Sequence, residues 1–140
     1  MTFLLDTNVI SEIGARKPDP QVVDWLRAQD IAGIFLSVIT VAEIRRGIAL
    51  SRDVEKRARL ELWFEDQVLD AFDGRILPVD VAIADLCGQL VAERQRAGRP
   101  IEPFDAVIAA TAEVHGLVLV TRNVRDFAGW GGRVFNPWDA

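Results

Sequence analysis

Short apolar runs alternate along the chain with segments whose apolar residues have helical spacing. The clearest runs are Thr2–Leu5, Ile34–Val38 and Leu117–Val120, and shorter extended pieces follow at Arg75–Val79 and Arg133–Pro137. The run Leu117–Val120 has no polar alternation, which is typical of a strand buried on both faces of a parallel sheet. We therefore expect an α/β protein with a three-layer α/β/α fold, a mostly parallel central sheet and an edge strand near the end of the chain.

Helical spacing fills the segments between these runs. Asp6 or Thr7 is expected to cap the first helix, and Gly14 is expected to end it. We expect Asp53–Asp73 and Asp80–Gly98 to form a helical pair that flanks the sheet, because only a short extended piece separates them. The helices are expected over the residues 7–14, 22–26, 40–50, 53–73, 80–98 and 104–116.

The length and charge of the chain limit its possible classes. The 140 residues are expected to form a single domain over 1–140, and the net charge of -5 argues against nonspecific coating of nucleic acid. No apolar run approaches the roughly 20 residues that a membrane helix needs. The first residues lack the basic flank of a signal peptide, so we expect a cytoplasmic protein with no membrane association.

Several kinds of catalysis lack the residues that they need. The chain has one histidine, one cysteine and no tyrosine, which excludes a two-histidine mechanism, an internal disulfide and a cysteine zinc site. Cys87 falls on the apolar face of its helix, which indicates a core residue. His115 falls in the last turn of a helix, where its positive charge interacts favourably with the helix dipole, which indicates a structural role. The glycines near Trp130 lack the Lys-Ser/Thr of a phosphate-binding loop. The remaining possibility is catalysis by carboxylates that act together with a hard cation.

Four polar positions are expected near one edge of the sheet. Asp6 follows the first strand, Asp105 opens a late helix, and Asn123 and Asp126 follow the strand Leu117–Val120. Because the carboxyl ends of parallel strands meet at one edge, these side chains are expected close together. Gathered carboxylates repel each other unless a cation holds them, and oxygen ligands suit Mg²⁺ or Mn²⁺.

Each of these acids also has a purely structural interpretation. Asp6 fits a helix N-cap, and Asp105 fits the first turn of a helix, where its charge complements the dipole. Glu43 stands three residues after Thr40, which is the spacing of a capping box, and it faces away from the apolar Ile44. The spacing alone favours capping or solvent exposure for Glu43, and it does not choose between a structural and a functional role for Asp6 and Asp105.

The ordered set of motifs resembles the PIN-domain ribonucleases, and more narrowly the VapC-type toxins of type II toxin–antitoxin systems, in the subgroup that includes the FitB proteins. The resemblance covers the whole chain, and no single motif carries it. The matching segments are Leu4–Glu12, Ser37–Ile44, Gly74–Pro78, Asp105–Ala112, Thr121–Asn123 and Phe135–Trp138.

The resemblance implies a catalytic site and a cofactor. Asp6, Glu43 and Asp105 would be three of the family's acidic residues, with Asp6 and Asp105 as the more direct metal ligands. The family often has an aspartate where this chain has Asn123, and a neutral amide is a weaker ligand, which puts a second metal in doubt. Asp126 is an alternative fourth acid. The implied activity is cleavage of RNA by an endoribonuclease that depends on Mg²⁺, or on Mn²⁺.

The same resemblance implies partners. A cognate antitoxin of the VapB or FitA type would silence the enzyme and would carry the contact with promoter DNA, and the toxin would form a homodimer. The arginines that flank the expected site are candidates for contacts with RNA phosphates, since the guanidinium group is a good fork for phosphate. They are Arg45, Arg46, Arg122 and Arg125.

Two other functions fit parts of the pattern. Asp6 after the first strand is also the position of a phosphoaspartyl nucleophile, in a phosphatase or a receiver-like domain. Such phosphatases usually have a second aspartate two residues later, where this chain has Asn8, and receivers need a late lysine, which is absent beyond Lys56. Asn123 would also fit an antitoxin-binding module that has become catalytically weak.

Overall fold

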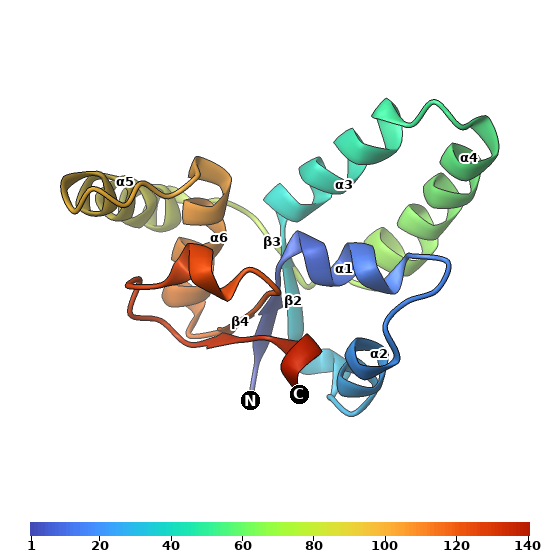
Figure 1. Ribbon diagram of the computed structural model, residues 1–140, viewed down its shortest axis with the longest axis horizontal. Helices are drawn as coiled ribbons and strands as arrows, with labels where there is room; N and C mark the ends of the chain where they lie inside the picture. Colours follow the sequence, from blue (N-terminus) through green and yellow to red (C-terminus); the bar gives the residue numbers. More distant parts are fainter.

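A five-stranded sheet forms the centre of the protein, whose computed structural model describes all 140 residues (Figure 1). The sheet has the order β3-β2-β1-β4-β5, and every neighbouring pair is parallel. The expected parallel sheet is confirmed, with β4 in its interior and the last strand at an edge. The strands are β1 (Phe3–Leu5), β2 (Ile34–Ser37), β3 (Ile76–Leu77), β4 (Val118–Val120) and β5 (Val134–Phe135).

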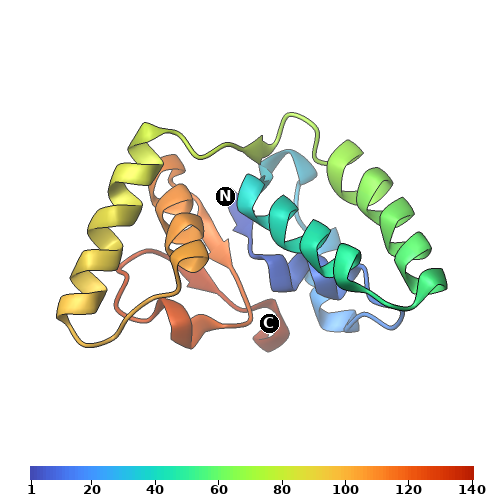
Figure 2. The same cartoon turned by 90° about the horizontal axis from the view of Figure 1, so that it is seen from above.

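Six α-helices cover the two faces of the sheet, as Figure 2 shows from above. Four of them lie on one face: α1 (Thr7–Ile13), α2 (Pro20–Arg27), α3 (Val38–Leu50) and α4 (Val54–Trp63). The other face carries α5 (Val81–Arg96) and α6 (Pro103–His115). Short 3-10 turns occupy Ile31–Gly33, Val124–Phe127 and Pro137–Asp139. None of the helices combines the length and the apolar composition needed to span a bilayer.

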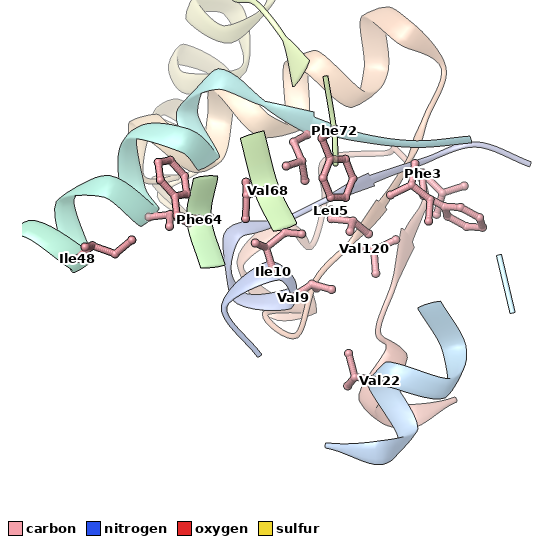
Figure 3. Packing of buried hydrophobic residues seen from close by; sticks show 14 residues of the cluster. Phe3, Leu5, Val9, Ile10, Val22, Ile48, Phe64, Val68, Phe72 and Val120 are labelled. Atoms are coloured by element: carbon pink, nitrogen blue, oxygen red, sulfur yellow. The ribbon is translucent and has the colours of Figure 1, made fainter. Parts of the chain in front are cut away.

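Each face of the sheet has its own hydrophobic core, because alternate strand residues point to opposite faces. Phe3 and Leu5 join the core beneath α1 to α4, where Figure 3 shows Leu5 close to Val120. Leu4 points the other way and joins the core beneath α5 and α6. Cys87 packs at the border of this second core, as its position on an apolar helix face predicted. The fold is therefore three layers.

The third helix begins earlier than its sequence pattern indicated. Strand β2 leads directly into α3 at Val38, and the Ser37 hydroxyl caps it by accepting a hydrogen bond from the Ile39 N–H. Thr40 therefore lies inside the first turn and is not a cap. The predicted capping box between Thr40 and Glu43 is wrong, which leaves Glu43 free for another contact.

The two flanking helices lie apart. The segment Asp53–Asp73 becomes α4 followed by a π-helical stretch, Phe64–Asp70, and α4 packs on α3. The segment Asp80–Gly98 becomes α5, which packs on α6 on the opposite face of the sheet from α4. The expected helical pair is corrected in this respect, because the connection between the two helices adds β3 to the sheet and carries the chain from one face to the other.

Candidate active site

Asp6 lies at the carboxyl end of β1, and hydrogen bonds fix both its backbone and its carboxylate. Its N–H donates to the Val120 carbonyl at 2.9 Å, and the residue is only 5% exposed. Oδ1 accepts from the Thr7 N–H at 2.8 Å, which caps α1. Oδ2 accepts from the Thr121 hydroxyl at 2.8 Å and from the Asn8 amide at 3.3 Å. The carboxylate therefore has one fixed orientation over the sheet edge.

Glu43 reaches the same edge from α3. Its Oε1 accepts a hydrogen bond of 2.6 Å from the Thr7 hydroxyl, and the Thr40 hydroxyl lies 3.1 Å from that Thr7 oxygen. Thr7 follows Asp6 directly, so a single turn of chain orients both acids. Glu43 was predicted for this site by resemblance alone, and its side chain contacts the turn that carries Asp6.

Asp105 enters from the opposite face, in the first turn of α6, and is half-buried. Its pKa is raised to about 7, and burial is the largest cause. The remaining causes are the negative charges of four other acids: Asp6, Glu102, Asp126 and Glu43. Because α1, α3 and α6 all begin at the carboxyl ends of the strands, the fold assembles acids from distant segments there (Figure 1).

The other two acids experience the same crowding. Burial raises the pKa of Asp6 despite the hydrogen bonds that favour its charged form, and Asp126 raises it further. Burial also raises the pKa of Glu43, with smaller contributions from Asp6 and Glu102. The shared cause is a concentration of negative charge in a poorly solvated place. Such clustered, perturbed acids are typical of functional sites.

Asn123 and Asp126, the two candidates for the fourth polar position of the site, differ in their surroundings. Asn123 is exposed, and its backbone N–H donates to the Thr121 hydroxyl at 3.0 Å, but its side chain makes no capping bond to the turn that follows. Asp126 lies within that turn and raises the pKa of both Asp6 and Asp105. The charge of Asp126 therefore acts on the acid cluster.

The donor set fits a hard divalent cation. Oδ1 of Asp6 accepts one hydrogen bond, so it keeps a free lone pair, and Asp105 has its charged form disfavoured by its neighbours. A cation between the acids would relieve this repulsion. No three of the acids form a ready-made metal cage. Mg²⁺ keeps several of its waters and needs only one or two direct carboxylates, so an open arrangement suits it.

The four candidate arginines take different positions. Arg45 stacks on the Phe64 ring at 4.7 Å, and Arg122 stacks on the Trp138 ring at 5.0 Å. Arg46 lowers the pKa of Glu43, which places its charge near the site.

Arg125 lines a cavity together with Asp105 and Asp126. Of the four arginines, it is the one that shares a cavity with the acids. Arg122 contacts the segment after β1 through its backbone, since its N–H donates to Asn8 Oδ1 at 3.2 Å.

The sequence patterns did not single out several residues that shape the site. Thr7, Asn8 and Thr121 hold the acids through hydrogen bonds, and Glu102 caps α6 and adds its charge beside Asp105. Thr7 and Asn8 belong to the same short segment as Asp6, which was the available signal. Thr121 is 115 residues from Asp6 in the chain, so only the fold reveals that contact.

Comparison with known proteins gives a consistent result. Residues 3–129 match the PIN domain family. The chain is 42% identical to "Toxin FitB" of Neisseria gonorrhoeae over 136 residues, covering 97% of this chain and 98% of that protein. It is 40% identical to "VapC ribonuclease Y4jK" of Sinorhizobium fredii over 137 residues, covering 98% of each.

Solved structures agree with this result. The crystal structure of FitAcB from Neisseria gonorrhoeae contains a chain that superposes with a TM-score of 0.93 at 40% identity, covering 99% of this chain and 100% of that one. A structure of FitAB bound to the IR36 DNA fragment has a TM-score of 0.91 at 40% identity, covering 98% of this chain and 96% of its counterpart.

Proposed function

The chain belongs to the PIN-domain family, among the VapC-type toxins, and on this premise we propose that it is a Mg²⁺-dependent endoribonuclease toxin of a toxin–antitoxin pair. One observation carries the proposal. Asp6, Glu43 and Asp105 come from three distant segments, and burial together with the charge of neighbouring acids raises the pKa of each. Two full-length relatives are named as a toxin and as a ribonuclease, respectively.

The roles follow from the contacts of each side chain. Asp6 and Asp105 would be the direct ligands of the cation, and Asp126, rather than Asn123, would supply the fourth charge. A bound Mg²⁺ would activate a water molecule and neutralise charge on the phosphate. Glu43 has one oxygen committed to Thr7, and its other oxygen is available to accept a proton from that water.

The proposal is tested by incubating the protein with single-stranded RNA in Mg²⁺, in Mn²⁺ and in EDTA. We expect cleavage with either metal and none in EDTA, and we expect Asp6→Asn to abolish it while circular dichroism shows an intact fold. Cleavage that persists in EDTA, or full activity of the folded Asp6→Asn protein, contradicts the proposal. Mixing the protein with a small phosphodonor tests the phosphoaspartyl alternative, which requires an acyl-phosphate on Asp6.

Calorimetry separates the enzyme from a catalytically weak binding module. Titration of Mg²⁺ or Mn²⁺ into the protein should show binding that Asp6→Asn weakens. A protein that binds an antitoxin but takes up no divalent cation near millimolar concentration would instead be such a module. The comparison needs no RNA, so it is independent of the choice of substrate.

The partner is an antitoxin of the VapB or FitA type, through which the pair would bind promoter DNA. Support comes from the similar chains in the FitAcB and DNA-bound FitAB structures. A groove of about 560 Å³ between α1, α3 and α4 suits an amphipathic segment of such a partner. Ile44, Ile48, Leu60 and Trp63 supply its apolar lining, and Glu43 lies on its wall. Homodimerisation remains a prediction from family resemblance.

A glycine pair offers a matched test of this groove. Gly47 lines it, and a Cβ added at Gly47 would meet no atom within 4 Å. We expect Gly47→Gln to weaken antitoxin binding at least about tenfold by occupying the groove, while RNA cleavage is kept. Gly88→Gln on α5 is the control, since a Cβ added there also meets no atom within 4 Å. Equal antitoxin affinity of the two variants would exclude the groove.

A further inference from the structure

A second cavity adjoins the acid cluster and has a different chemical character. Its volume is about 330 Å³, and it lies between the end of α5, the loop into α6, the start of α6 and the Val124–Phe127 turn. Apart from Pro100 and Ile101, its lining is charged: it has the arginines Arg94, Arg99 and Arg125 and the acids Glu102, Asp105 and Asp126. It therefore joins a cationic wall to the acids of the proposed metal site.

Arg94 is the unusual member of this wall. It is only 8% exposed, although a buried cation is costly unless it is well paired. Nε donates to the Arg99 carbonyl at 2.8 Å, and Nη2 donates to the Asp126 carbonyl at 3.4 Å. Both acceptors are neutral, and Nη1 has no hydrogen-bond partner. Arg94 therefore lines the charged cavity with a nearly buried guanidinium, whose Nη1 is itself buried and has no hydrogen-bond partner.

Arg99 and Arg125 add exposed guanidinium groups to the same cavity. A guanidinium group presents a planar set of donors that matches the oxygens of a phosphate. A free anion would be repelled by the charges of Asp105 and Asp126 in the same cavity. A divalent cation held by those acids would offset their negative charge, and the arginines would then be able to bind a phosphate group in this cavity.

We propose that this cavity binds a backbone phosphate of the RNA, next to the phosphate that is cleaved, with Arg94, Arg99 and Arg125 as its cationic wall. The inference rests on the proposed ribonuclease function and adds to it a substrate-positioning subsite. Of the three arginines of this cavity, Arg125 alone was among the residues predicted from the sequence to contact RNA. Arg94 lies near the end of α5 and Arg99 lies in the loop that follows it, and the sequence pattern did not single out either residue.

The test uses the exposed arginines, because replacing buried Arg94 endangers the fold. The double variant Arg99→Gln with Arg125→Gln is compared with Arg96→Gln, an exposed arginine of α5 outside the cavity. For cleavage of a short single-stranded RNA in Mg²⁺, we expect the double variant to raise KM about tenfold or more and to leave kcat within about twofold. The control should match the wild type in both constants.

Salt dependence supplies a second readout that a merely structural effect would not move. Each lost phosphate contact on a single strand lowers the slope of log affinity against log salt by about 0.7, so the double variant should lose about 1.4. An unchanged KM and an unchanged slope, with RNA still cleaved, would overturn the subsite and leave the ribonuclease intact.

Binding distinguishes a failure of the subsite from a failure of the proposed function. If the protein cleaves no RNA, its affinity for the same RNA in Mg²⁺ is measured by fluorescence anisotropy. Weaker binding and a smaller salt slope in the double variant than in Arg96→Gln then support the phosphate subsite although the ribonuclease proposal has failed. Equal affinities and slopes overturn the subsite as well.

Discussion

The Thr7 hydroxyl lies 2.6 Å from the Glu43 carboxylate, and this contact joins the turn after β1 to the first turns of α3. Thr7 also donates its N–H to Asp6. One residue thus sets the spacing between two acids that are 37 positions apart in the chain. We therefore expect this contact to orient Glu43 for the proposed reaction.

Replacing Thr7 by valine should misplace Glu43 and preserve the shape of the residue. We expect kcat/KM for RNA cleavage to fall by about tenfold, the factor that corresponds to ~1.4 kcal/mol. Thr7→Ser keeps the hydroxyl and should stay within about threefold of the wild type, because its hydrogen bond to Glu43 is retained. Equal activity of the serine and valine variants would mean that the hydroxyl does not orient Glu43.

Removing the charge of Asp126 should act on the other acids of the cluster. Asp126→Asn removes a negative charge that raises the pKa of Asp105 and of Asp6, so the pKa of both should fall. Carbon-detected NMR titration of labelled aspartate measures this shift. Asn123→Ala is the matched control and should leave both values unchanged, since its side chain carries no charge. If the pKa of Asp105 is the same in Asp126→Asn as in the wild type, Asp126 does not act on the other acids.

Stability should depend on pH through Asp105. Its folded pKa of about 7 exceeds its ordinary value of 3.8, so the folded state binds more protons than the unfolded state between these values. The free energy of unfolding should therefore decrease as pH rises from about 4 to about 7 in metal-free buffer. Asp105→Asn should flatten this dependence, as urea unfolding at several pH values will show. A wild-type stability that rises over this window contradicts the assignment.

The end of α1 should tolerate no side chain at Gly14. A Cβ there would lie 2.5 Å from two ring atoms of Trp63 on α4. Gly14→Ala should therefore destabilise the protein by about 1–3 kcal/mol. Gly47→Ala, where a Cβ meets nothing, should instead stabilise it by roughly 0.5–1 kcal/mol through helix propensity. Thermal unfolding compares the two variants. Opposite signs are expected, and a neutral Gly14→Ala would show that the Trp63 ring moves freely.

Local patterns predicted the elements of this fold well. The apolar runs located β1, β2 and β4, and the cap at Asp6 and the stop at Gly116, which has a φ of 65°, bounded their helices. The start of α3 was missed because Ser37 ends a strand and caps a helix at once. The π-helical stretch Phe64–Asp70 keeps the four-residue apolar repeat, so spacing could not distinguish it from an α-helix.

The candidate site was less accessible to sequence reasoning. The acids themselves could be named, and Asp6 and Asp105 were expected at the sheet edge. The contacts that hold them join residues far apart in the chain, such as Thr121 with Asp6, and spacing carries no information about them. The unpaired donor of Arg94 is likewise a result of packing, since its sequence surroundings resemble an ordinary helix surface.

The most direct measurement is the rate of RNA cleavage by two variants of a single helix, α6. Asp105→Asn removes a proposed metal ligand in its first turn, and Glu113→Gln removes an exposed acid near its end. In Mg²⁺ at pH 8, where Asp105 is ionised in the wild type, we expect Asp105→Asn to lower kcat by about 100-fold or more and Glu113→Gln to change it less than twofold. Equal rates for the two folded variants would contradict a metal-dependent ribonuclease site at these acids.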